Sequence, residues 1–255
     1  MRHTSVLVLS DNQTVLNGFI DLLGQEPDLS ADRTFTFACY AGNDSLADKT
    51  LGGHPIEPLN VKKEARHIGD KFDLVISAHC KQIFPDELVK AVTCINIHPG
   101  YNPYNRGWYP QVFSILNGLP LGATIHEIDT ELDHGDIIDQ ERIELRPDDT
   151  SRTAYDRVLG LEIKLLSRNL ESILDGTYEA HPPKEEGNVN YRKDFDALCE
   201  LDPNERLTSK EVIDRLRALT HPPYKNAYFI DPTSGEHVWV EVALRAEGSD
   251  HEQAA

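Results

Sequence analysis

An apolar run and a polar loop meet in the segment Val92-Thr-Cys-Ile-Asn-Ile-His-Pro-Gly-Tyr-Asn-Pro-Tyr-Asn-Arg-Gly107. The apolar part, Val92–Ile97, predicts a β-strand, and the Pro, Gly and Asn residues after it predict a loop. Because side chains alternate along a strand, Asn96 and His98 share one face where this strand ends. Open α/β sheets bind ligands at the carboxyl ends of their strands, so we expect functional residues here.

The residues on both sides of this segment alternate between strand-like and helix-like patterns. Short apolar or alternating runs predict strands at Ser5–Leu9, Thr34–Tyr40, Phe72–Ser77, Gly122–Ile128 and Ile137–Leu145. Apolar residues at helical spacing predict helices over residues 15–23, 85–89, 108–116 and 150–175. Strands that alternate with helices indicate βαβ units, so the sequence predicts an α/β fold with a mostly parallel sheet.

The composition changes in the polar stretch Pro182–Asn190, where we place a domain boundary. Beyond it, Thr208 and Glu211 have the spacing of a capping box, which predicts a helix that ends before Pro222. Two short segments, 227–230 and 237–243, flank a turn-forming sequence and predict a β-hairpin. The expected organisation is an α/β domain at 1–185, a helix and hairpin subdomain at 186–245, and a disordered tail at 246–255.

The chain of 255 residues is strongly acidic, since 25 Lys and Arg stand against 43 Asp and Glu and give a net charge of −18. Phosphate binding depends on Lys and Arg, so this charge argues against nucleic acid and anionic membranes as partners. No apolar run approaches the ~20 residues of a membrane-spanning helix. The four cysteines form no Cys-x-x-Cys pair, so we expect reduced cysteines and a cytoplasmic protein.

The Asn96 and His98 side chains could take part in catalysis. A histidine can move a proton near neutral pH, and an asparagine can hydrogen-bond an oxyanion without changing the proton count. The alternative is that Asn96 caps the strand end and His98 begins a turn. The spacing of the two residues leaves both interpretations open.

A second polar segment, Thr124–Asp139, carries several acidic residues between two predicted strands. Its turn is either a solvated hairpin tip or the source of a carboxylate that orients His98 or stabilises the protonated imidazole. A metal site is a third interpretation, and its ligands would come from His98, His126, Asp129, Asp133 and His134. Since their spacing matches no recognised metal motif, we expect no metal.

Together these two segments resemble the formyltransferases that use N10-formyltetrahydrofolate. The family pattern is Asn-x-His-Pro, then Arg-Gly, then Leu-Asp-x-Gly, and it matches Asn96-Ile-His98-Pro99, Arg106-Gly107 and Leu132-Asp133-His-Gly135. The resemblance covers about residues 1–180 and implies a Rossmann-like α/β domain. It also implies that Asn96 stabilises an oxyanion, that His98 relays a proton, and that Asp133 orients the histidine.

The loop after His98 narrows the resemblance. Gly100-Tyr-Asn-Pro-Tyr-Asn105, with Trp108-Tyr-Pro110, is similar to the nucleotide-sugar N-formyltransferases rather than to the purine and tRNA branches. Residues 190–193 and 222–226 are similar to the C-terminal portion of that subgroup. The resemblance implies N10-formyltetrahydrofolate as co-substrate and a dTDP-linked amino-dideoxysugar as acceptor, used in bacterial O-antigen or other surface-glycan synthesis. It leaves open whether the amine is at C3 or C4 of the sugar.

Binding residues are expected around the catalytic set, the folate contacts from the resemblance and the nucleotide-sugar contacts from the chemistry of the side chains. The folate is expected to contact Lys81, Gln82, Ile83, Phe84, Thr130 and Asp133. The nucleotide sugar is expected to contact Asn12, Lys81, Tyr101, Arg106, Tyr224 and Asn226. Lys81 could equally be a solvated lysine, the aromatic residues could be ordinary packing, and Arg106 could pair with a nearby carboxylate. The C-terminal hairpin is expected to form a homodimer interface.

Two other functions stay open. One is a different folate-dependent formyl transfer, or the hydrolysis of formyltetrahydrofolate. The other is a nucleotide-sugar-binding protein that keeps the fold without catalysis. The intact set of Asn96, His98 and Asp133 argues against binding alone, and the net charge of −18 argues against a tRNA substrate.

Overall fold

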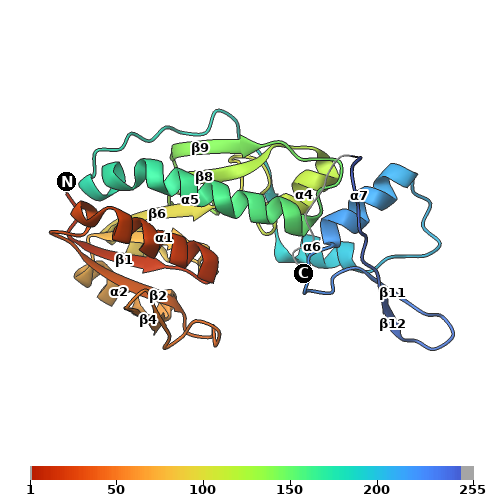
Figure 1. Ribbon diagram of the computed structural model, residues 1–255, viewed down its shortest axis with the longest axis horizontal. Coiled ribbons are helices and arrows are strands. Elements are labelled where there is room, and N and C mark those ends of the chain that lie inside the picture. Colours follow the sequence, from red (N-terminus) through yellow and green to blue (C-terminus); the bar gives the residue numbers. More distant parts are fainter. Residues whose placement is uncertain (1, 248–255) are drawn as a thin grey trace.

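The computed structural model describes residues 2–247, and an eight-stranded sheet forms its centre (Figure 1). The strands follow the spatial order β3, β4, β2, β1, β5, β6, β8, β9. Their bounds are β1 Ser5–Leu9, β2 Thr34–Tyr40, β3 Thr50–Leu51, β4 His54–Leu59, β5 Leu74–Ala78, β6 Thr93–His98, β8 Leu121–Glu127 and β9 Ile137–Ile143. The predicted α/β fold with a large, mostly parallel sheet is confirmed.

The strands β4, β2, β1, β5 and β6 run parallel to one another, whereas the pairs β3–β4, β6–β8 and β8–β9 are antiparallel. The register between β6 and β8 places Asn96 opposite His126 and His98 opposite Thr124. Residues that face each other across an antiparallel pair project from the same side of the sheet. The end of β6 and the strand β8 therefore bring four polar side chains to one face.

Helices cover both faces of this sheet (Figure 1). On one face lie α1 (Gln13–Gln25) and α5 (Ser151–Asp175), which bury their apolar side chains against the strands. On the other face lie α2 (Val61–Lys71) and α3 (Asp86–Ala91), with a separate apolar cluster beneath them. Two helical layers around a mostly parallel sheet are what βαβ connections produce.

The long helix α5 connects the sheet to the C-terminal part of the protein (Figure 1). The Thr150 hydroxyl caps its start by accepting from the backbone N–H of Thr153, and Gly176 ends it with φ +61°. Its apolar side chains recur at helical spacing and pack on the sheet. Glu162 interrupts this apolar face because it is a carboxylate with no exposed surface.

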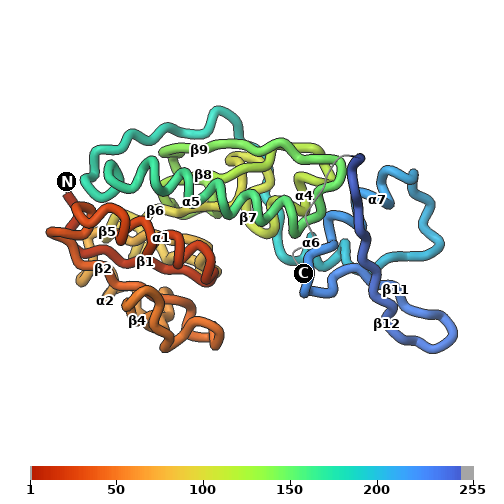
Figure 2. Tube along the Cα trace, viewed as in Figure 1, coloured from red at the N-terminus to blue at the C-terminus, as the bar shows by residue number. Residues whose placement is uncertain are grey.

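The C-terminal part packs around α4 (Pro110–Asn117) and pairs β10 with β7 (Figure 2). Its elements, with β7, are β7 Arg106–Gly107, β10 Val189–Asn190, α6 Arg192–Cys199, α7 Ser209–Leu219, β11 Tyr228–Ile230 and β12 His237–Trp239. A third apolar cluster joins α4 to Phe195 and Leu219. The loop that holds β7 is thus supported by residues far along the chain.

Most predicted elements are confirmed; five predicted strands differ by one or two residues at an end, and the strand predicted at 237–243 ends at Trp239. The strand β4, the two-residue strands β3, β7 and β10, and the helices α2 and α6 were not predicted. The predicted helix and hairpin after residue 186 are present, while the domain boundary itself stays a prediction. Most of the predicted tail at 246–255 lies outside the described residues. Within residues 2–247, no helix is long and apolar enough to cross a membrane.

Candidate active site

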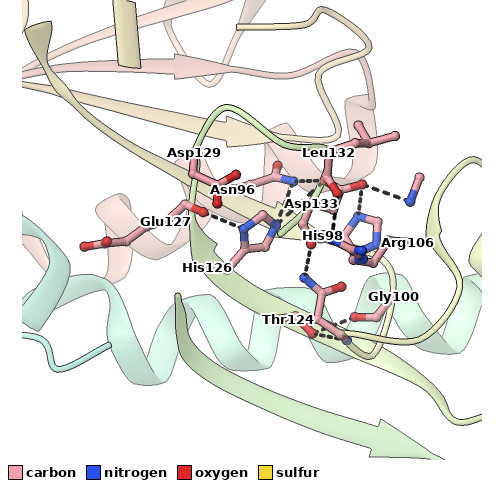
Figure 3. Close-up of polar contacts among 12 residues, drawn as sticks. Asn96, His98, Gly100, Arg106, Thr124, His126, Glu127, Asp129, Leu132 and Asp133 are labelled. Atoms are coloured by element: carbon pink, nitrogen blue, oxygen red, sulfur yellow. Dashed lines mark hydrogen bonds and ion pairs between the residues drawn. The ribbon is translucent and has the colours of Figure 1, made fainter. Parts of the chain in front are cut away.

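Asn96, His126 and Asp133 meet at the end of β6 (Figure 3). The Asn96 side-chain nitrogen donates to Asp133 Oδ1 over 3.1 Å and lies 3.3 Å from His126 Nε2. His126 Nδ1 lies 2.7 Å from the Glu127 carbonyl oxygen, so Nδ1 carries the hydrogen and donates. In a neutral ring Nε2 then accepts from Asn96. The two hydrogens of the Asn96 side-chain amide therefore point to His126 Nε2 and to Asp133 Oδ1.

His98 lies beside the same carboxylate, with Nδ1 3.6 Å from Asp133 Oδ2. Its side chain is buried, and burial lowers the pKa of His98 from 6.5 to about 4, although Asp133 opposes this change. The imidazole is therefore neutral near pH 7 and can accept a proton. Its other nitrogen, Nε2, is buried and has no hydrogen-bond partner among the described residues.

Asp133 is held on a tight turn after β8. Its φ of +48° lies in the left-handed region, which aspartate tolerates better than most residues. Oδ2 accepts from the Gly107 backbone N–H over 3.0 Å, and the Asp133 carbonyl accepts from the Asn102 side chain over 2.9 Å. The loop after His98 therefore fixes both the carboxylate and the backbone of Asp133. Figure 3 shows these contacts converging on the labelled Asp133.

The loop after β6 is itself tied to β8 through Thr124. The Thr124 hydroxyl donates to the Gly100 carbonyl over 2.7 Å and accepts from the Asn102 backbone N–H over 3.0 Å. A Cβ atom on Gly100 would lie 2.4 Å from His98 Nε2, which is closer than side-chain atoms approach each other. Gly100 is needed because it leaves space for the His98 ring. The φ of Gly100 is not positive, so the backbone conformation alone does not require a glycine.

The three residues predicted to be catalytic, Asn96, His98 and Asp133, are brought together by the fold. His126 is an additional member that was named only as a candidate metal ligand. Burial lowers its pKa, so its ring is neutral as well. The sequence placed His126 two residues after Thr124 on a predicted strand. It did not predict the antiparallel register that brings His126 opposite Asn96.

The residues expected to contact folate lie after β5 and in the turn before Asp133. The Lys81 backbone N–H donates to Asp11 Oδ2, while Gln82 bonds to the backbone of Val61 and Leu59. Ile83 is 81% exposed, whereas Phe84 is buried against α2 and α3. Thr130 is exposed. Ile83 is thus the apolar side chain of this loop that is free to contact a ligand, and the folate contacts stay predictions.

The residues expected to contact the nucleotide sugar are distributed over a wider area. Asn12 caps α1 through its side-chain oxygen and donates from Nδ2 to the Tyr155 hydroxyl over 3.0 Å. The Asn226 side chain donates to the Leu219 carbonyl. Tyr101 is half-buried, and Tyr224 is 66% exposed. These four residues do not form one contact cluster with Asn96, and their binding roles stay predictions.

Arg106 lies close to the catalytic turn but does not pair with a carboxylate. Its guanidinium donates to the carbonyl oxygens of Leu132 and Glu186, each over 3.4 Å, and its Nε atom has no described partner. A buried guanidinium with a spare N–H next to the site is suited to an anionic ligand. Across residues 2–247, no group of three His, Cys, Asp or Glu side chains is placed to hold a metal ion.

The geometry is suited to proton transfer next to a stabilised oxyanion. A neutral histidine can accept a proton, an amide can donate to an oxyanion, and a carboxylate orients both. The catalytic set contains no serine or cysteine nucleophile. The fold and this set are those of an α/β enzyme whose chemistry combines a general base with an oxyanion donor.

Comparison with known proteins identifies the family. A formyl transferase model matches residues 60–170, and an N-formyltransferase dimerization C-terminal domain matches residues 194–246. The chain is 41% identical over 244 residues to a dTDP-4-amino-4,6-dideoxyglucose formyltransferase from Mycobacterium tuberculosis, covering 95% of this chain and 97% of that protein. The chain therefore belongs to the formyltransferase family.

Solved structures give the same result. A 4-N formyltransferase from Francisella tularensis is 42% identical with a TM-score of 0.89, and the match covers 96% of this chain and 99% of the other. A sugar N-formyltransferase from a Shewanella species is 39% identical with a TM-score of 0.89, over the same shares of both chains. This chain is thus a sugar N-formyltransferase by fold and by family.

Proposed function

We propose that this protein transfers the formyl group of N10-formyltetrahydrofolate to the amine of dTDP-4-amino-4,6-dideoxyglucose or a close 4-amino analogue. The observation that carries the proposal is the convergence of Asn96, His98 and Asp133 at the end of β6. Binding alone does not need a neutral, buried base next to an amide donor. The match to a relative with this named activity, over 95% of the chain, supports the same substrate class.

The names of similar relatives support C4 as the position of the amine. The relatives at 41% and 42% identity are named for a 4-amino sugar and for 4-N formyl transfer. A further relative, 27% identical with a TM-score of 0.56, was solved with a 4-formamido nucleotide sugar and tetrahydrofolate. These names support C4, which the sequence pattern left open. They also support a folate as the formyl donor.

In the proposed mechanism, the neutral sugar amine attacks the formyl carbon of the folate. Asn96 donates to the developing oxyanion through the hydrogen that points to His126, because this 3.3 Å contact is the longer of its two. His98 takes a proton from the attacking nitrogen and returns it to the leaving folate nitrogen. Asp133 stabilises the imidazolium that forms between these steps. Proton transfer of this kind typically contributes about 10²–10⁴-fold.

The C-terminal hairpin is proposed to form a homodimer interface. The family domain that matches residues 194–246 is described as a dimerization domain. Three apolar side chains of β11 and β12 are exposed, namely Ile230, Val238 and Trp239. Burial of such side chains against a second copy removes apolar surface from water. A cytoplasmic location and a role in bacterial surface-glycan synthesis complete the proposal.

The decisive experiment supplies N10-formyltetrahydrofolate with dTDP-linked 3-amino and 4-amino sugars in parallel. The expected result is formylated 4-amino sugar with stoichiometric tetrahydrofolate, together with a much lower rate on the 3-amino sugar. Release of formate without any sugar identifies a hydrolase and overturns the proposal. Tight binding of the nucleotide sugar without turnover identifies a binding protein. Formylation of a purine precursor identifies a different acceptor class.

A further inference from the structure

A second histidine–carboxylate pair lies at the same edge of the sheet. His79 follows directly after β5, and its Nε2 atom lies 2.5 Å from Glu162 Oε2 on α5. Glu162 has no exposed side-chain surface, and His79 has 9%. Burial raises the pKa of Glu162, while His79 acts in the opposite direction. The proposed mechanism gives this pair no role, although burying a carboxylate is costly unless it is paired.

The hydrogen bonds around His79 have a fixed direction. Asn12 accepts backbone N–H bonds from Thr14 and Val15 through its oxygen, so its Nδ2 must be the donor to the Tyr155 hydroxyl oxygen. The Tyr155 hydroxyl, which lies 3.1 Å from His79 Nδ1, can then donate to that nitrogen. His79 therefore carries its hydrogen on Nε2 and donates it to Glu162. The basic atom of the pair is Nδ1, and it faces Tyr155.

The pair is near the catalytic histidine. β5 and β6 are adjacent parallel strands, so His79 and His98 lie at neighbouring strand ends. Their charges interact, because a positive charge on His79 lowers the pKa of His98. His79 also has φ +62°, an unfavourable backbone for a residue with a side chain, and its carbonyl accepts from the Asp11 N–H. The backbone is thus held in a strained conformation that directs the ring toward α5.

The balance of the reaction needs a second proton acceptor. At neutral pH the free sugar amine is largely an ammonium. The overall reaction is therefore R–NH₃⁺ plus N10-formyltetrahydrofolate giving R–NH–CHO, tetrahydrofolate and one H⁺. His98 can carry only the proton that it returns to the folate nitrogen. The proton that leaves the ammonium before the attack goes either to solvent or to a protein group other than His98.

We propose that His79 is this second acceptor, with Tyr155 as the relay and Glu162 as the stabilising carboxylate. The inference rests on the proposed amino-sugar acceptor. One N–H bond of the ammonium breaks as its proton passes to the Tyr155 oxygen, and the Tyr155 hydroxyl proton passes to His79 Nδ1. Tyr155 ends unchanged, the sugar amine is neutral, and the His79 imidazolium pairs with Glu162. The imidazolium returns its proton to solvent after the product leaves.

Titratable groups from three segments face this relay. Glu162 and Tyr155 come from α5, and His98 comes from the end of β6. His221, which follows α7, has its ring centre 5.4 Å from that of Tyr155. Burial lowers the pKa of His221, so this ring stays neutral and adds no positive charge near Tyr155. Glu162 is thus the carboxylate that contacts the His79 ring.

The test is the pH profile of kcat/KM for the amino sugar in Glu162→Gln, His79→Gln and Tyr155→Phe. A first measurement of wild-type turnover on the 4-amino sugar settles the proposed function separately. We then expect each variant to lose about 10²-fold near pH 6.5 and to recover most of the loss near pH 9.5, where the amine needs no base. Glu171→Gln, an exposed residue of the same helix, is the matched control.

A loss that is equal at every pH shows a structural role for the pair and overturns the inference. Wild-type rates in all three variants overturn it as well. Circular dichroism and thermal unfolding establish that each variant is folded. If Glu162→Gln fails to fold, Tyr155→Phe still carries the test, because it removes the relay hydroxyl and leaves the His79–Glu162 bond in place.

Discussion

The Asn96 side-chain nitrogen lies 3.1 Å from Asp133 Oδ1, although the two residues are 37 positions apart in the chain. The bond joins the end of β6 to the turn after β8, so the oxyanion donor and the carboxylate are positioned together. Asp133 Oδ2 is held in addition by the Gly107 N–H. Each oxygen of the Asp133 carboxylate thus accepts from its own donor. Replacing the carboxylate by a neutral group of the same shape therefore disturbs at least one of these two hydrogen bonds.

Asp133→Asn is expected to reduce kcat by about 10²–10⁴-fold while the protein still folds. The amide that replaces the carboxylate brings an NH₂ group against either Asn96 Nδ2 or the Gly107 N–H, and two donors cannot satisfy each other. We expect a loss of about 1–3 kcal/mol in the free energy of unfolding. Steady-state kinetics and urea unfolding measure both effects. A kcat within a few fold of wild type contradicts a role for the carboxylate.

His126→Phe is expected to reduce kcat by about tenfold and to change both KM values little. The substitution removes the Nε2 acceptor, which leaves one Asn96 N–H unsatisfied and the amide free to turn. A lost hydrogen bond of about 1.4 kcal/mol corresponds to this factor. His67→Phe, on the exposed side of α2, is the control. An unchanged kcat in His126→Phe shows that Asn96 is positioned by Asp133 alone.

Gly100→Ala is expected to lower kcat strongly, because the new methyl group meets His98 Nε2 at 2.4 Å and must displace the ring. Overpacking of this kind typically costs about 1–3 kcal/mol of stability. Gly160→Ala provides the opposite control, since nothing lies within 4 Å of its added methyl group and the site is inside α5. That variant is expected to gain about 0.5–1 kcal/mol with normal activity. Thermal unfolding and kinetics of both proteins compare the two sites.

The free energy of unfolding is expected to fall as the pH is lowered from about 6.5 toward 4. The pKa of His98 is about 4 in the folded protein and 6.5 in the unfolded chain, so only the unfolded chain binds a proton in this range. Stability therefore rises with pH across the interval, by about 2 kcal/mol between pH 5 and pH 7.5. Urea unfolding at both pH values measures it. His98→Gln should flatten the dependence, and an equally steep slope in that variant assigns it to other groups.

Trp239→Lys is expected to convert the proposed homodimer to a monomer. The Trp239 side chain is 42% exposed on the hairpin, and a charge there cannot be buried against a second copy. Tyr40→Lys is the control, because Tyr40 has the same exposure but lies at the end of β2. Light scattering coupled to size-exclusion chromatography gives the mass of each variant. A Trp239→Lys protein that stays dimeric places the interface elsewhere.

The catalytic residues were predictable to different degrees. Asn96 and His98 follow from a strand pattern that ends in a polar loop, whereas Asp133 needed the family resemblance. His126 was missed as a catalytic partner because its contact with Asn96 depends on β8 running antiparallel to β6. The contact between His79 and Glu162 depends in the same way on tertiary structure, because it spans 83 residues and the rotation of α5 about its axis.

The missed elements also have physical explanations. Pro55 and Pro58 argue against a strand, yet β4 lies next to the edge of the sheet, where prolines are tolerated. The helix α2 buries Val61, Ala65 and Ile68 at helical spacing, so a search for that period would have found it. The helix α6 buries little besides Phe195 and leaves a weak pattern. Its position depends on packing with α4 and α7.

The antiparallel pairing of β6 with β8 holds the candidate catalytic side chains, while most of the chain between the two strands is left to contact the acceptor. The two strands hold Asn96, His98 and His126 through backbone hydrogen bonds, whatever the length of the excursion between them. Residues 99–120 form that excursion, in which Asn102 and Gly107 hold Asp133 while the other residues shape the surroundings of the cluster. We expect a loop from a relative with a different acceptor to be accepted between the same two strands only when it keeps the Asn102 and Gly107 contacts with Asp133.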